Sequence, residues 1–243
     1  DAIMVSCTEE QAQFQSLYGS APGSIEVVAP GVERAFFSPG DRRGARHALG
    51  LGSGPMLLFV GRIQPLKGLD VAVRTLAEIG RNDAQLIVVG GASGVEGATE
   101  LARVEALIQE LGLVGRVKFY EPQPHHLLST FYRAADVVLV PSRSESFGLV
   151  ALEAAACGIP VVATAVGGLL NLIEDGKTGF LVPGRDVSGF ARFTRGLLDD
   201  SLLAISMGTA AAHRAQAYSW KSAALKARSV YTELLERDLV ACS

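Results

Sequence analysis

Cysteine is scarce in this sequence and so constrains the compartment. Only three of the 243 residues are cysteines, Cys7, Cys157 and Cys242, and no two of them have C-x-x-C spacing. An odd, widely spaced set argues against both a disulfide framework and a zinc site. We therefore expect free thiols in a reducing, cytoplasmic compartment, with Cys157 as a small buried filler.

Excess positive charge and long apolar runs are also lacking. The chain carries 22 Lys and Arg against 25 Asp and Glu, a net charge of −3. This balance gives no electrostatic basis for binding nucleic acid or an anionic membrane surface. No apolar segment approaches the ~20 residues that a membrane helix requires, and no cationic-then-apolar leader follows Asp1. We expect neither a nucleic-acid partner nor a membrane span.

Histidine and tryptophan are rare too. The four histidines, His47, His125, His126 and His213, show neither metal-ligand spacing nor a catalytic triad pattern. The adjacent pair His125 and His126 points in different directions on a helix. These residues are expected on the surface or at helix caps, while the single tryptophan, Trp220, is expected to pack the last helix.

What the chain does have is a regular alternation of apolar runs and helical patterns. Hydrophobic residues make up 49% of it, enough for a sizeable core. Strands are predicted at 57–60, 86–89, 117–120, 137–140, 160–164 and 179–182, and helices at 69–79, 99–111, 126–135, 149–156, 169–173, 187–198, 202–218 and 221–236. Continuous Val, Ile and Leu strands separated by helices predict an α/β fold, a Rossmann-like parallel sheet with helices on both faces.

Residues 1–38 follow a different pattern. A short strand, an amphipathic stretch at 9–18, a second strand at 25–28 and a turn at Pro30-Gly31 look like the end of a preceding unit. The chain opens directly into this unit, as if it had been cut from something longer.

One motif places two cations after a strand. Gly61-Arg62 follows the apolar run 57–60, and Lys67-Gly68 precedes the next helix. Gly61 would allow close backbone approach to a ligand, while Arg62 offers a planar fork and Lys67 a mobile point charge. The pair suits a diphosphate, and the alternative is two solvated surface cations.

A second motif contains two acids separated by seven residues. Glu145 lies in the polar loop after strand 137–140, and Glu153 lies in the helix that begins near Phe147. Both could face the crevice beyond the strand ends, with the N–H groups of residues 147–149 between them. A carboxylate accepts two hydrogen bonds from a vicinal diol, as in a sugar or ribose. Alternatively, both are ordinary acids favoured by the helix dipole.

Three glycine-containing stretches resemble phosphate-binding motifs less well. The cluster from Gly90 to Gly97 lacks G-x-G-x-x-G spacing and is better interpreted as a flexible loop near a ligand. Gly176-Lys177-Thr178 would need glycine at position 171, where the chain has Asn171, so we interpret it as a turn. The pair Gly167-Gly168 either leaves room for a ligand or starts a short helix.

Together these motifs resemble a known family. Gly61-Arg62 with Lys67-Gly68, the run from Ser144 through Glu153 to Ala154, the run 156–162 and the run 175–182 resemble the carboxyl-terminal half of retaining glycosyltransferases of family 4. These enzymes have the GT-B fold, and the likeness extends to D-inositol-3-phosphate glycosyltransferases and sucrose-phosphate synthases. It covers nearly the whole chain, in the family's order.

The resemblance implies a role for each residue. Arg62 and Lys67 would hold the diphosphate, Glu145 would contact the donor sugar near the reacting carbon, and all three would be catalytic. The remaining donor-binding positions would be Gly61, Gln123, Ser146, Phe147, Gly148, Leu149 and Glu153, with Gln123 along the base and Glu153 on the ribose. Cations and a helix amino end would stabilise charge on the leaving phosphate.

The resemblance also implies a division of the chain. Residues 1–38 would be a remnant of an amino-terminal domain and linker, 39–218 the nucleotide-sugar-binding domain, and 219–243 a return helix and tail. The expected substrate is a UDP-sugar, without a cofactor, and without a metal because no Asp-x-Asp is present. The partners would be the donor and a missing acceptor domain, and the exposed remnant could self-associate.

Two features limit what is carried over from the family. Many relatives continue after the double glycine with a proline and an acid, where this chain has Leu169-Leu170-Asn171, so no donor contact is assigned there. Two other functions also use such a fold: a nucleotide-sugar-binding module without activity, and half of a nucleotide-sugar epimerase.

Overall fold

The computed structural model describes residues 2–19 and 23–241, with side chains described to residue 236. The first part contains β1 (Ala2–Val5), α1 (Thr8–Tyr18) and β2 (Ser24–Val27). The strands of the large sheet are β3 (Met56–Val60), β4 (Gln85–Val89), β5 (Val117–Tyr120), β6 (Val137–Val140), β7 (Val161–Thr164) and β8 (Gly179–Val182). The remaining helices are α2 (Arg42–Ala48), η1 (Pro65–Lys67), α3 (Leu69–Glu78), α4 (Gly97–Glu110), α5 (His125–Ala134), α6 (Leu149–Ala156), α7 (Leu169–Leu172), α8 (Val187–Asp199), α9 (Ser201–Ala215) and α10 (Trp220–Ala241).

The large sheet confirms the predicted α/β architecture. Its six strands are all parallel, in the order β5-β4-β3-β6-β7-β8. The chain moves outward from β3 through β4 to β5, then returns to the other side of β3 with β6. Such a reversal opens a crevice beyond the carboxyl ends of the strands, between the loops that follow β3 and β6.

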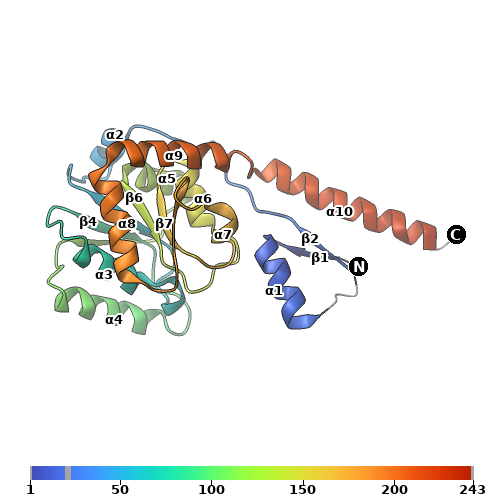
Figure 1. The fold of residues 1–243 in the computed structure, drawn as a ribbon, viewed down its shortest axis with the longest axis horizontal. Helices are drawn as coiled ribbons and strands as arrows, with labels where there is room; N and C mark the ends of the chain where they lie inside the picture. Colours follow the sequence, from blue (N-terminus) through green and yellow to red (C-terminus); the bar gives the residue numbers. More distant parts are fainter. Residues whose placement is uncertain (1, 20–22, 242–243) are drawn as a thin grey trace.

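Both faces of this sheet are buried, which explains the continuous apolar strands. In β3, Leu57 packs into one hydrophobic cluster with Leu76 of α3, while Leu58 packs into another with Leu152 of α6. Successive side chains of a strand point to opposite faces, so each face receives every second residue. Figure 1 shows α3, α4 and α8 on one side of the sheet and α5 and α6 on the other. Cys157 is buried, as predicted, and burial raises the pKa of its thiol to about 12.

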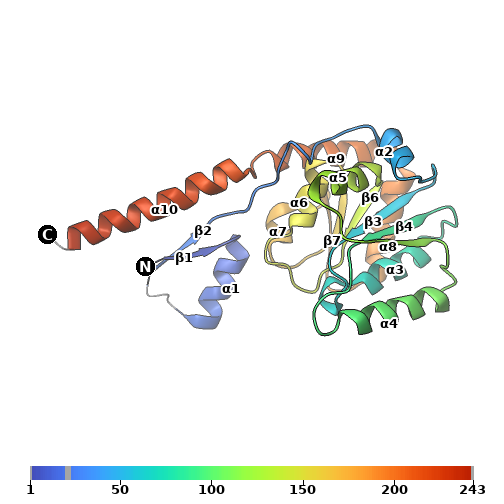
Figure 2. The same ribbon diagram turned by 180° about the vertical axis from the view of Figure 1, so that it is seen from behind.

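A second, smaller unit stands apart from the sheet. We call β1, α1, β2 and α10 the small lobe, which Figures 1 and 2 show beside the main body from opposite sides. The strands β1 and β2 pair in parallel, and Lys226 of α10 forms a 2.8 Å ion pair with Glu26 of β2. Residues far apart in sequence therefore build one lobe. The proposed domain limits at 38 and 218 stay predictions.

Two chain connections join the small lobe to the main body, and they touch. Val32 donates a backbone hydrogen bond to Tyr218 O at 3.2 Å. A Cβ atom on Gly31 would lie 2.1 Å from the backbone nitrogen of Trp220, so only glycine fits there. Contrary to expectation, Trp220 contributes little packing to the last helix, because 53% of its surface is exposed. Among the described residues, no helix is both long and apolar enough to cross a membrane.

Candidate functional site

A cavity of about 360 Å³ lies at the carboxyl edge of the sheet, where β3, β4 and β5 end. It is lined by Val60, Gly61, Arg62, Val89, Gly90, Gly91, Ala92, Ser93, Pro122, Gln123 and Leu128. Three predicted site residues, Gly61, Arg62 and Gln123, thus come together although they belong to two different loops. The glycine-containing loop after β4 forms another part of the same wall, and its position near a ligand stays a prediction.

Glycines allow the loops after β3 and β4 to pack side by side. Gly61 and Gly90 both have φ of +150°, a conformation that other residues rarely adopt. A Cβ atom on Gly90 would lie 1.9 Å from Gly61 O. Gly61 donates to Val89 O at 3.0 Å, and Ile63 forms a bridge with Ala92. In this structure, Gly61 thus serves loop packing, while close approach to a ligand stays a prediction.

The two predicted motifs meet at one ion pair. Lys67 ends the short helix η1, and its Nζ lies 2.7 Å from Oε2 of Glu145. The two side chains are 21% and 18% exposed, so the pair is partly shielded from water. Gly68 adopts φ of +71° in close packing against Pro141 O, and Arg143 donates to Leu66 O at 2.8 Å. These contacts fasten the loop after β3 to the loop after β6.

Arg62, unlike Lys67, has no carboxylate partner among the described residues. Its side chain is exposed, and within the described part of the chain it forms neither an ion pair nor a hydrogen bond. It lines the cavity beside Gly61. A guanidinium that is not committed to a protein carboxylate keeps all five N–H donors available, which is the arrangement an anionic ligand needs.

The double glycine, Gly167-Gly168, packs against the backbone of the loop that carries Glu145. Gly168 donates to Glu145 O at 2.9 Å, and a Cβ atom on Gly168 would lie 2.4 Å from Cα of Phe147. On Gly167 it would lie 1.9 Å from Glu145 O. In this structure the two glycines let α7, whose N-cap is Gly168, approach the loop, while room for a ligand at this position stays a prediction. Ser142 Oγ also donates to Glu145 Oε2, at 3.2 Å, a contact that the sequence did not reveal.

The predicted residues after Glu145 form the entry to α6. Gly148 is the N-cap with φ of +101°, so the helix begins at Leu149 rather than near Phe147. Phe147 is buried against Tyr218, whereas Ser146 and Leu149 are exposed. Ser146 O accepts a hydrogen bond from Cys7 Sγ of the small lobe at 3.1 Å. The first-turn N–H groups of α6 lack partners within the helix and are suited to an anion.

Glu153 lies one turn further along α6 and is not part of the cavity wall. Its Oε2 accepts a 2.7 Å hydrogen bond from the hydroxyl of Tyr132, a fully buried residue of α5. Burial raises the pKa of Glu153, although the Tyr132 hydrogen bond and the nearby His125 oppose the shift. Burial also raises the pKa of Tyr132 well above its ordinary value, so its hydroxyl stays a donor. Sequence reasoning missed Tyr132, because an aromatic residue in an amphipathic helix ordinarily indicates core.

A second cavity, of about 380 Å³, lies at the other end of the strands, where they begin. Each arginine lining it is committed to a carboxylate: Arg42 and Arg46 to Asp136, and Arg81 to Asp83 and Asp199.

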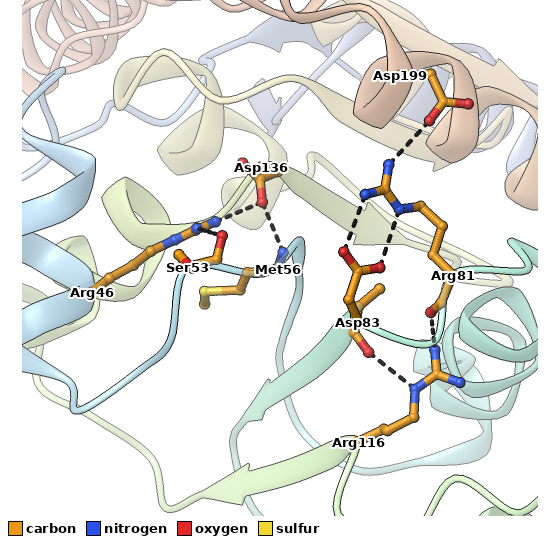
Figure 3. Close-up of polar contacts among 9 residues, drawn as sticks. Arg46, Ser53, Met56, Arg81, Asp83, Arg116, Asp136 and Asp199 are labelled. Carbon is orange, nitrogen blue, oxygen red and sulfur yellow. Dashed lines mark hydrogen bonds and ion pairs between the residues drawn. The ribbon is translucent and has the colours of Figure 1, made fainter.

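Figure 3 shows this network joining the starts of neighbouring strands. Asp136 also accepts from Met56 N at 2.8 Å, and Arg116 donates to Arg81 O at 2.6 Å. Each of its arginines thus already donates to acceptors of the protein. We therefore assign the network to fold stability.

The chain is thus a doubly wound parallel α/β domain with an exposed arginine, a Lys–Glu pair and a helix amino end at its switch point. The sequence profile of the family described as glycosyl transferases group 1 matches residues 41–214. The chain belongs to this family.

Similar proteins support the same family. A D-inositol 3-phosphate glycosyltransferase from Acidothermus cellulolyticus is 46% identical over 242 residues, which cover 97% of this chain and 54% of that protein. The chain thus spans about half the length of the curated relatives it matches.

Solved structures agree with the fold. Sucrose-phosphate synthase from Thermosynechococcus elongatus superposes with a TM-score of 0.88 and 36% identity, covering all of this chain and 59% of that one. HepE from Anabaena, in complex with UDP and glucose, gives a TM-score of 0.86 and 25% identity, covering 97% and 63%. The fold is one half of the GT-B architecture that these neighbours share.

Proposed function

We propose that this chain is the donor-binding half of a retaining, metal-independent glycosyltransferase that uses a UDP-sugar in the cytoplasm. The observation that carries the proposal is the Lys67–Glu145 pair, held 2.7 Å apart, together with Arg62, which lines the cavity and has no ion-pair partner among the described residues. The HepE structure, a complex with UDP and glucose, supports the choice of donor.

Each group has a chemical task in this proposal. Breaking the glycosidic bond of the donor leaves negative charge on the diphosphate, which Arg62, Lys67 and the first turn of α6 would stabilise. A charge-assisted hydrogen bond contributes about 1.5–3 kcal/mol. Glu145 would accept hydrogen bonds from sugar hydroxyls, with its orientation fixed by Lys67 and Ser142. The described residues include no group of three His, Cys, Asp or Glu arranged to hold a metal ion, and metal independence stays a prediction.

Calorimetric titration with UDP, ADP and GDP tests the donor site. We expect saturable binding that is tightest for UDP. Arg62→Ala and Lys67→Ala should each weaken it by about tenfold or more, because each removes a charge-assisted contact to the diphosphate. Arg74→Ala is the matched control: Arg74 is an exposed arginine of α3 whose removal makes the same charge change. Binding that is unaffected by both site variants, or absent for all three nucleotides, would contradict the proposal.

A transfer assay separates an enzyme half from a binding module. We propose that a further, acceptor-binding domain completes the active site. The 243-residue chain alone should then bind the donor yet transfer little sugar, and adding the amino-terminal domain of a relative should increase the rate. Robust transfer by the chain alone would refute this division of labour. Donor binding with no transfer even when that domain is added would favour the module.

A further inference from the structure

A buried tyrosine, Tyr132, forms a hydrogen bond with the side chain of Glu153. Tyr132 is completely inaccessible to solvent, and its hydroxyl donates to Oε2 of Glu153 at 2.7 Å. Phe37, from the connection between β2 and α2, packs edge-on against the Tyr132 ring with 5.8 Å between centroids. Arg133, the next residue of α5, donates to Ser38 O at 2.8 Å and so fixes that connection in place. The direction of the Tyr132 hydroxyl is thereby set by packing.

One alternative is that Glu153 merely satisfies a buried hydroxyl. A backbone carbonyl or an amide would do this without placing a charge in a poorly solvated position. An ionised carboxylate has about four acceptor sites, and a single hydroxyl uses only one of them. Among the described residues, Tyr132 is the only hydrogen-bond partner of the Glu153 carboxylate. Most of the accepting capacity of Glu153 is therefore left for a molecule outside this chain.

The pair lies next to the cavity. Leu128 lines the cavity wall, and it precedes Tyr132 by one turn on the same face of α5. Val60, another wall residue, packs against the same hydrophobic cluster as Leu128 and Tyr132. Tyr132 thus connects the cavity wall on one side with Glu153 of α6 on the other.

We propose that Tyr132 is a positioning residue for nucleotide recognition: by holding Oε2 of Glu153, it aims Oε1 at the two hydroxyls of the ribose. This inference rests on the proposed function, in which Glu153 accepts hydrogen bonds from the ribose. It adds a residue that touches neither the sugar nor the diphosphate. Its effect is confined to ligands that carry the vicinal diol.

Calorimetry with two probes, UDP and 2′,3′-dideoxy-UDP, tests this role on the 243-residue chain. The wild type should prefer UDP. Tyr132→Phe keeps the ring and its packing and removes only the hydroxyl, so affinity for UDP should fall about three- to tenfold. Affinity for the dideoxy probe should stay within about twofold. Tyr231→Phe, an exposed tyrosine of α10, is the control and should leave both affinities unchanged.

The outcomes separate the inference from the proposed function. An equal loss for both probes in Tyr132→Phe indicates general loosening of the core and overturns the inference, as does unchanged affinity for UDP. Equal binding of both probes by the wild type overturns it without any variant. If Tyr132→Phe fails to fold, Glu153→Gln should abolish the preference for UDP, and a retained preference overturns the inference. No saturable UDP binding by the wild type overturns the proposed function and this inference with it.

Discussion

Glu153 carries its charge where the surroundings disfavour it. Burial raises the pKa of its carboxyl above the ordinary value of 4.5. The folded state therefore holds the proton to higher pH than the unfolded state. The protonated carboxyl of Glu153 therefore contributes to folding stability. This contribution is fully present below the pKa of the unfolded state and is lost as the pH rises through the pKa of the folded state. Ionisation of the Glu153 carboxyl therefore lowers the stability of the fold.

Replacing Glu153 by glutamine should therefore stabilise the fold at neutral pH. The amide oxygen still accepts from Tyr132, while the buried charge is removed. The melting temperature of Glu153→Gln should exceed that of the wild type at pH 7, and the difference should shrink towards pH 4. Circular dichroism melts across this range measure it. Glu105→Gln, on the exposed face of α4, is the control, and an advantage that is equal at both pH values would contradict the explanation.

Individual contacts differ in how far the sequence could predict them. The meeting of Lys67 and Glu145 follows from strand order, since the loops after neighbouring parallel strands share one edge. Tyr132 could not be found this way, because its spacing in α5 fits a core position equally well. The start of α6 at Leu149 agrees with the predicted helix 149–156, and Gly148, with φ of +101°, explains why the stretch beginning at Phe147 is not helical from its first residue.

At the scale of elements, α7 can contact the loop that carries Glu145 because Gly167 and Gly168 have no side chains. Gly168 has an ordinary helical φ of −61°, so alanine there is excluded by space and not by backbone conformation. An added methyl group would push against Phe147 and Ser146, and so displace the loop. The strands were predictable from their apolar runs, whereas this approach of two backbones has no local signature in the sequence.

Gly168→Ala should therefore impair binding and lower stability. We expect a loss of about 1–3 kcal/mol in unfolding free energy, as for other overpacked sites, with weaker UDP binding. Urea unfolding and calorimetry measure the two effects. Gly196→Ala is the opposite case: Gly196 lies within α8, and an added Cβ meets nothing within 4 Å. It should raise stability by about 0.5–1 kcal/mol and leave binding unchanged. If the two variants changed the unfolding free energy and the UDP affinity equally, displacement of the loop by Gly168→Ala would be excluded.

At the scale of the whole molecule, the small lobe has a sheet of only two strands, β1 and β2. Unpaired strand edges favour association with another chain. Met4 of β1 and Leu17 and Tyr18 of α1 are exposed apolar residues of this lobe. The small lobe therefore presents exposed apolar side chains. Its origin as a remnant of another domain stays a prediction, and its self-association stays a proposal.

Sedimentation velocity at increasing concentration tests self-association. The wild type should shift towards a dimer, and Met4→Lys should suppress the shift by placing a charge on β1. Leu202→Lys makes the same kind of change on α9, at a residue 78% exposed and outside the small lobe, and should have no effect. A wild type that stays monomeric, or equal suppression by both variants, would exclude association through this lobe.

Gly31 and Trp220 pack against each other where the two connections to the small lobe cross. Both connections to the small lobe pass this one point, and beyond it Arg133 ties the first connection to the main body. A rotation of the small lobe about this point would separate Cys7 from Ser146 while leaving the Lys67–Glu145 pair and the large sheet unchanged. Lys67 and Glu145 would keep their relative geometry at every orientation of the lobe. The solvent exposure of the loop that carries Ser146 would then change without any change in the position of Lys67 relative to Glu145.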